Sequence, residues 1–140
     1  MSVEEYKGQV QRWIEALNDG TAFDCIGDVY APNFVLHDPS LPEPLRGHEA
    51  LAAFMRAVLA AFPDCHYTID DLFAEGDRVV LRASCRATHQ GEFAGVPATG
   101  KEVTIALVSI LRFENGKAVE EWQMVDSLGL MQQLGAIPAG

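Results

Sequence analysis

Residues 65–90 read CHYTIDDLFAEGDRVVLRASCRATHQ, and this stretch decides the class of fold. Before it, apolar residues recur at helical spacing, whereas within and beyond it they alternate with polar residues, as in half-buried strands. Gly76 and the pair Asn115-Gly116 are hairpin turn signals, and the Gly/Pro-rich segment 91–100 joins two long strands. The second half is therefore predicted to be an antiparallel meander, with strands over 65–74, 78–90, 102–113 and 117–126.

Working outward, three amphipathic helices are predicted ahead of the meander. The first follows a capping box formed by Ser2 and Glu5 and stops at residues 18–20, Asn-Asp-Gly. The second ends before Pro32, and the third carries an apolar stripe that Pro63 closes. A short strand over 34–38 and a loop with Pro39, Pro42 and Pro44 lie between the second and third helices, and a short helix over 127–134 ends the chain.

These elements indicate one domain of class α+β spanning residues 1–140. A curved antiparallel sheet covered on one face by the three N-terminal helices would have the shape of a cone. A chain of 140 residues buries enough surface for a core and a ligand cavity together. We therefore expect a hydrophobic cavity between helices and sheet.

The charge balance argues against two classes of partner. The chain carries 20 acidic and 10 basic side chains, a formal net charge of -10, and has no basic cluster. Such a surface repels phosphate backbones and anionic headgroups, so we expect no nucleic-acid partner and no membrane partner. The richest apolar stretch, 50–62, is interrupted by Arg56 and is shorter than a bilayer requires.

Other sequence signals favour a cytoplasmic protein without a metal or organic cofactor. Glu4 and Glu5 stand where a signal peptide would carry positive charge. The cysteines Cys25, Cys65 and Cys85 are odd in number and far apart, so we expect reduced thiols and neither a disulfide nor a zinc site. Neither a dinucleotide fingerprint nor a cluster of histidines and carboxylates at ligand spacing occurs.

The C-terminal half carries a family resemblance. Its motifs are HQGEFAGVPATGK at 89–101, RF at 112–113, GK at 116–117, EW at 121–122 and DSLGLMQQLG at 126–135. With these motifs the chain resembles the SnoaL-like polyketide cyclases, α+β cones of the nuclear-transport-factor-two-like superfamily. The resemblance implies an aspartate acid/base one residue after Trp122 and a supporting histidine on the preceding strand. Here these positions hold Gln123 and Ser109, and an amide can orient a carbonyl but cannot carry a proton.

A second resemblance concerns the N-terminal half. Residues 10–13 (VQRW), 37–39 (HDP) and 43–44 (EP) are similar to ketosteroid isomerases. That similarity implies that Asp38 is a proton-abstracting base, and that Trp13 and Ser109 occupy oxyanion-hole positions with weaker donors. From the residues alone, Asp38 has a second interpretation, as the cap of an Asx turn before Pro39.

Further candidates come from strand alternation. His89 shares the inward face of its strand with Cys85 and Ala87, either as a core residue or as an acid inside the cavity. Glu121 shares a face with Gln123 and is the nearest substitute for the missing acid. The predicted catalytic residues are thus Asp38, Glu121 and His89, and the predicted substrate-binding residues are Trp13, Ser109, Gln123, Trp122 and Phe54.

Two functions remain open at this point. The first is a cofactor-independent lyase or isomerase that moves protons on a small apolar carbonyl compound, by isomerisation, dehydration or aldol cyclisation. The alternative is a non-catalytic small-molecule binder or accessory dimeric protein that has lost the family acid at Gln123. In both cases the family resemblance implies a homodimer through the open sheet face, and the alternation of Thr104, Ala106, Val108 and Ile110 on one strand supports it.

Overall fold

The structure is a computed structural model that describes residues 2–138. Along the chain, the elements are α1 (Val3–Asp19), α2 (Ala22–Val29), β1 (Tyr30–His37), β2 (Leu45–Arg46), α3 (Gly47–Ala61), β3 (His66–Glu75), β4 (Arg78–Thr88), β5 (Glu102–Glu114), β6 (Lys117–Val125) and α4 (Ser127–Leu134). The order confirms the α+β class predicted from the change of hydrophobic period.

The strands form one six-stranded sheet in the order β2-β1-β6-β5-β4-β3. The meander from β3 to β6 is antiparallel, as predicted, but β1 pairs with β6 in parallel, so the sheet is mixed. In this pairing Leu36 lies opposite Glu121 and His37 lies opposite Trp122. The chain leaving β1 therefore starts beside the middle of β6, which positions the candidate site.

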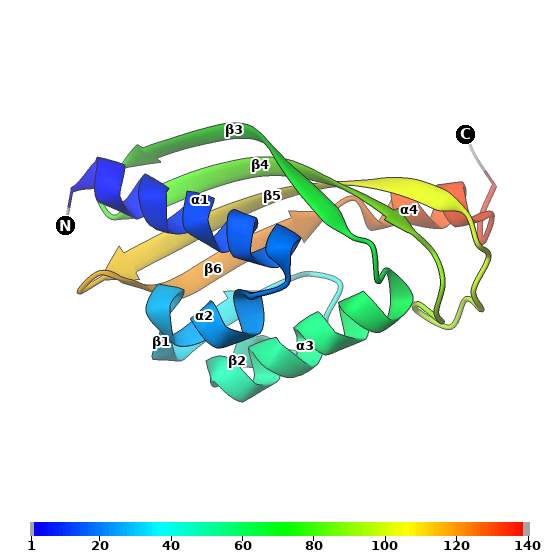
Figure 1. Ribbon diagram of the computed structural model, residues 1–140, viewed down its shortest axis with the longest axis horizontal. Coiled ribbons are helices and arrows are strands. Elements are labelled where there is room, and N and C mark those ends of the chain that lie inside the picture. The colour runs from blue at the N-terminus through cyan, green and yellow to red at the C-terminus, as the bar shows by residue number, and fades with distance from the viewer. Residues whose placement is uncertain (1, 139–140) are drawn as a thin grey trace.

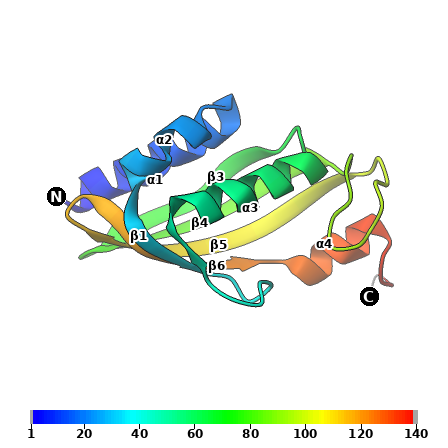
Figure 2. The same cartoon turned by 90° about the horizontal axis from the view of Figure 1, so that it is seen from below.

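The helices α1, α2 and α3 lie on one side of the curved sheet, and α4 lies at its far end beside the loop of residues 91–100 (Figures 1 and 2). The capping box predicted at the start of α1 is present, since Ser2 and Glu5 exchange hydrogen bonds. The apolar stripe of α1 packs on the concave sheet face, where Tyr6 stacks on Phe113 at a centroid distance of 4.7 Å. Helices and sheet thus enclose the volume expected of a cone.

The structure differs from the sequence prediction around Pro32. The second helix stops at Val29, and β1 begins at once at Tyr30 instead of at residue 34. The register of the β1–β6 pair shifts between Tyr30 and Val35, which explains how a proline, lacking an N–H, is tolerated inside the strand. The short strand β2 falls in a segment predicted to be a loop.

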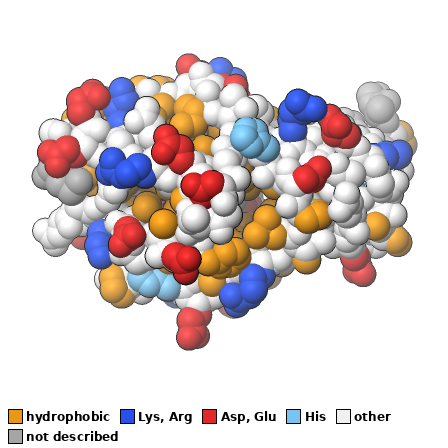
Figure 3. Space-filling view, viewed as in Figure 1, with side chains coloured by type: hydrophobic (Ala, Val, Ile, Leu, Met, Phe, Trp, Pro, Cys, Tyr) orange, Lys and Arg blue, Asp and Glu red, His pale blue; other side chains and the backbone are white. Residues whose placement is uncertain are grey.

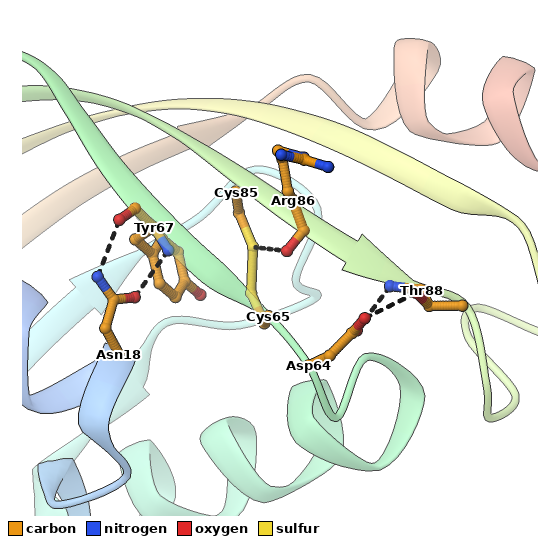
Figure 4. The surroundings of a disulfide bond; sticks show 7 residues. All are labelled: Asn18, Asp64, Cys65, Tyr67, Cys85, Arg86 and Thr88. Carbon is orange, nitrogen blue, oxygen red and sulfur yellow. Dashed lines mark hydrogen bonds between the residues drawn. A yellow bond between two sulfur atoms is a disulfide. The ribbon is translucent and has the colours of Figure 1, made fainter.

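The expectation of three reduced cysteines is wrong for two of them. Cys65 and Cys85 form a disulfide with a Cα–Cα distance of 6.1 Å (Figure 4), and Cys25 is free. Antiparallel pairing of β3 and β4 places Tyr67 opposite Cys85, which brings two cysteines 20 residues apart into contact. Two cysteines that are far apart in the sequence are therefore adjacent in the fold. None of the helices within residues 2–138 is long and apolar enough to cross a bilayer.

Candidate functional site

A cavity of about 430 Å³ lies between the helices and the concave face of the sheet. Side chains from α1, α3, α4 and all the long strands line it, and most of them are apolar. Its polar lining residues are Trp13, Tyr30, Asp38, Ser40, Tyr67, Ser109, Glu121, Gln123 and Ser127. An apolar hollow with a few polar groups at defined places is the usual form of a small-molecule site.

Glu121 is the most buried carboxyl group of the cavity, with only 5% of the residue exposed. It lies on β6, opposite Leu111 of β5 and Leu36 of β1. Burial raises the pKa of Glu121, hydrogen bonds from Tyr30 and Ser109 oppose this rise, and the charge of Asp38 adds to it. Glu121 is therefore suited to hold a proton that it can donate.

Tyr30 is the partner of Glu121 that sequence reasoning missed. Its hydroxyl donates to Glu121 Oε1 at 2.7 Å, and burial and the neighbouring carboxyl raise the pKa of this phenol. The ring of Trp13 packs edge-on against it at 5.2 Å. In the sequence, Tyr30 only continues the apolar pattern of the second helix, and the contact spans 91 residues. No local signal could have identified it.

Asp38 lies directly after β1, and the structure confirms the Asx-turn reading of its Asp-Pro motif. Its Oδ1 accepts hydrogen bonds from the Ser40 N–H at 2.8 Å and the Ser40 hydroxyl at 2.7 Å, which is an Asx turn. Its Oδ2 accepts from Gln123 Nε2 at 2.9 Å, and the residue also lines the cavity. These donors hold Asp38 as an acceptor and fix its carboxylate at the cavity wall.

Gln123 and Ser109 lie opposite each other in the β5–β6 register, and both line the cavity. The Gln123 amide takes the position that the family resemblance gives to an acid, and it holds Asp38 instead. The Ser109 hydroxyl is directed at Glu121. The cavity wall therefore carries two clusters of polar residues. One consists of Ser40, Asp38 and Gln123, and the other consists of Tyr30, Glu121 and Ser109.

Two of the predicted site residues lie outside the cavity. Phe54 of α3 lines the cavity, as proposed, but His89 and Trp122 do not. His89 is fully buried behind Phe62, where its Nδ1 accepts from the Thr99 N–H at 3.2 Å and lies 3.0 Å from the Thr99 hydroxyl. Its Nε2 has no partner among the described residues. His89 thus fastens the loop of residues 91–100, whose Phe93 does line the cavity.

Trp122 points to the opposite face of β6 because it alternates with Glu121 and Gln123. There it stacks on His37 at 5.6 Å, while Arg78 lies 5.3 Å from the centre of its ring. Glu120, on the same outer face, bonds to His37 and Arg112. Trp122 therefore belongs to a polar and aromatic cluster outside the cavity.

The arrangement can hold an apolar carbonyl compound between two carboxyl groups, of which the buried Glu121 has a raised pKa. Asp38 is placed to accept a proton and Glu121 to donate one, which are the two halves of general acid–base catalysis. Within residues 2–138, no group of three histidine, cysteine or carboxylate side chains could hold a metal ion.

Comparison with known proteins extends this picture. Residues 8–134 match the family model described as SnoaL-like polyketide cyclase. The chain is 29% identical over 131 residues to the aklanonic acid methyl ester cyclase DnrD of Streptomyces peucetius, which covers 90% of this chain and 88% of the relative.

Solved structures agree in fold. The crystal structure of AclR from Streptomyces galilaeus, whose suggested activity is hydroxylation, superposes with a TM-score of 0.87 at 34% identity, covering 98% of this chain and 100% of that one. A SnoaL-like protein from Jannaschia sp. CCS1 gives a TM-score of 0.87 at 25% identity, covering 96% and 94%. Since these relatives differ in the activity suggested for them, the reaction must be argued from the site itself.

Proposed function

Because the chain belongs to the SnoaL-like polyketide cyclase family, we propose that it is a polyketide cyclase-like enzyme that closes a ring by intramolecular aldol addition, without a cofactor. The observation that carries the proposal is the pair of carboxyl groups in one apolar cavity. Asp38 has hydrogen-bond donors on both oxygens, whereas the buried Glu121 has a raised pKa. Two acids in contrasting surroundings are the usual basis for assigning a base and an acid.

In this mechanism the Asp38 carboxylate removes a proton from a carbon next to a carbonyl group. The enolate carbon then attacks a second carbonyl carbon of the same molecule and forms the new carbon–carbon bond. Glu121 gives its proton to the oxygen that becomes an alkoxide, and the proton on Asp38 returns to Glu121 through solvent. The product is an isomer of the substrate, so the reaction needs no oxidant or reductant.

The position of the acid distinguishes this chain from the pattern that the resemblance implies. The amide of Gln123 cannot exchange protons, but Glu121 is two residues earlier on the same face of β6. The proposed acid has therefore moved along the strand by one side-chain position on that face. The Trp13 indole N–H lines the cavity and is the proposed donor for the developing oxyanion.

The test uses aklanonic acid methyl ester, the compound in the name of DnrD, and chromatography that separates a cyclised isomer of equal mass. In parallel, NMR in D₂O measures exchange of protons next to the ketone. We expect cyclisation by the wild type and rates about 10² to 10⁴ lower in Asp38→Asn, the usual contribution of a general base. Glu120→Gln, on the outer face, is the matched control and should keep the wild-type rate.

Equal exchange rates for the wild type and Asp38→Asn would refute the role of Asp38. The alternative from the sequence, a non-catalytic binding protein, requires tight binding of the ester with no exchange and no isomer. It is supported less well, because both Asp38 and Glu121 line the cavity.

We also propose that a second copy of the chain covers the open face of the sheet. Val108 and Met124 are 39% and 61% exposed there, in contrast to their inward neighbours Leu107 and Gln123. An apolar sheet face of this kind favours association. Light scattering should give twice the chain mass, and a monomer at micromolar concentration would contradict this.

A further inference from the structure

We propose that a hollow between α1 and α3 is a second binding subsite, which takes an uncharged apolar extension of the molecule held in the cavity. The proposal rests on the proposed function, since it assumes that the cavity binds a polyketide. It goes beyond it by adding a second subsite, the hollow, and by stating the chemistry of the substituent that this subsite takes.

The hollow has a volume of about 450 Å³ and is framed by the C-terminal end of α1, the start of α2, the last turns of α3 and the start of β3. Figure 3 shows a recess bordered by hydrophobic side chains on this face of the molecule. Five residues line both the hollow and the main cavity: Leu17, Phe54, Val58, Cys65 and Tyr67. At most one layer of side chains therefore separates the two volumes, and we call these five residues the throat.

The rim of the hollow is apolar where most of the surface is polar. Phe23 of α2 and Leu59 of α3 are 37% and 38% exposed, and both line the hollow. The other large hydrophobic side chains with comparable exposure in the described part of the chain, Phe73, Val108, Met124 and Leu128, do not line it. Exposed apolar groups gathered around a recess indicate a surface that an apolar ligand covers.

The charges at the rim restrict what can bind. Asp64 accepts hydrogen bonds from the Thr88 N–H and hydroxyl at 2.6 and 2.7 Å, and these bonds lower the pKa of its carboxyl. Asp19 is held in the same way by Thr21, with its Oδ1 accepting from the Thr21 N–H at 3.0 Å. Two fixed carboxylates at the rim disfavour an anionic extension, and the largely apolar lining disfavours burial of any charge, so the ligand class is neutral.

The throat contains one polar group that is free to meet a ligand. Asn18 holds the backbone of Tyr67 on both sides, at 2.7 and 2.9 Å (Figure 4), which positions its ring between the two volumes. Burial raises the pKa of the Tyr67 phenol, so it remains a donor. Within residues 2–138 its hydroxyl forms no hydrogen bond, which leaves it available for a ketone or hydroxyl oxygen where the side chain leaves the core.

The size of the main cavity supports this division of the ligand. A volume of about 430 Å³ is near the lower end of the usual range for ligand pockets, roughly 300–1,000 Å³. A substrate core of ordinary ligand size would fill most of it. Any longer substituent would then need the adjacent hollow.

The experiment measures equilibrium binding without turnover, so its failure can be distinguished from failure of the proposed aldol chemistry. The probes are 1,8-dihydroxyanthraquinones with a methyl or pentyl chain at carbon 3, and a third whose pentyl chain ends in a carboxylate. Quenching of tryptophan fluorescence reports binding, because Trp13 lines the cavity. The variants are Leu59→Asp and Phe23→Asp at the rim, with Phe73→Asp as the matched exposed control on β3.

We expect the pentyl probe to bind the wild type at least about tenfold more tightly than the methyl probe, since each buried CH₂ contributes up to about fourfold. The carboxylate-tipped probe should lose this gain. Each rim variant should reduce the gain to less than about threefold and leave the methyl probe unaffected, whereas Phe73→Asp should retain it. An equal gain in the rim variants, no gain in the wild type, or no binding of any probe would overturn the proposal.

Discussion

Replacing Glu121 by glutamine should change how the stability of the protein depends on pH. The carboxyl group is buried and accepts the Tyr30 hydroxyl at 2.7 Å. Glutamine keeps a carbonyl oxygen for this hydrogen bond and cannot ionise, so the variant retains the contact and removes the buried charge. The difference in unfolding free energy between the two proteins then isolates the ionisation of one group.

The sign follows from the direction of the pKa shift. Burial raises the pKa of Glu121 above the ordinary value for a glutamate, so the folded state keeps this proton where the unfolded state has released it. The stability that this proton contributes is complete at acid pH and is lost as the pH rises through the folded-state pKa. Between the two pKa values, wild type should lose at most about 1.4 kcal/mol per pH unit relative to Glu121→Gln.

For a domain of this size, that slope corresponds to about 3 to 5 °C in Tm per pH unit. The assay is thermal unfolding of both proteins from pH 4 to pH 8. Glu120→Gln is the control, because hydrogen bonds from His37 and then Arg112 lower the pKa of Glu120, and its contribution is lost as the pH falls. A Tm difference between wild type and Glu121→Gln that stays constant over this range would refute the assignment of Glu121 as a buried, protonated acid.

Three further changes have defined outcomes. Tyr30→Phe keeps the ring between Trp13 and Phe34 but removes the hydroxyl that donates to Glu121 Oε1. The free energy of unfolding, measured in urea, should therefore fall by about 1 to 2 kcal/mol. An unchanged urea midpoint would show that this hydrogen bond does not stabilise the fold. Alkylation of the denatured protein without reductant should label Cys25 alone, and three labels under this condition would contradict the disulfide. Reduction should make all three thiols reactive. It should also lower the free energy of unfolding by about 3 kcal/mol, the value for a disulfide that closes a loop of about this length. Thr99→Val removes the hydroxyl next to His89 Nδ1 and should speed amide hydrogen exchange across residues 91–100, as measured by mass spectrometry. Unchanged exchange rates there would show that this contact with His89 does not stabilise the loop.

The parts of the fold that sequence predicted are those with local causes. The helix at 127–134 was predicted to the residue because Asp126 caps its start and Gly135, in the left-handed region, ends it. The meander could be predicted from the alternation of apolar and polar residues, because a strand with one buried face has a buried side chain at every second residue. Asp38, Glu121 and Gln123 were placed in the cavity by the same alternation together with the family resemblance.

The parts that sequence could not predict depend on contacts between distant segments. The hydrogen bond from Tyr30 to Glu121 requires the parallel pairing of β1 with β6, and no turn or capping signal in the sequence indicates this pairing. The disulfide requires the register of β3 on β4. Trp122 is predicted to bind substrate, but it alternates with Glu121 and Gln123 and therefore lies on the outer face of β6.

The pairing of β1 with β6 also determines when the site can exist during synthesis. The hydrogen bond between Asp38 and Gln123 joins residues 85 apart, so it can form only after most of the chain has left the ribosome. Contacts of such high contact order close large loops and form slowly, which makes them late events in folding. A nascent chain that ends before residue 117 has α1, α2, α3 and five of the six strands but lacks one wall of the cavity. A ligand can therefore stabilise only the completed chain, and it cannot assist the folding of the segment that precedes residue 117.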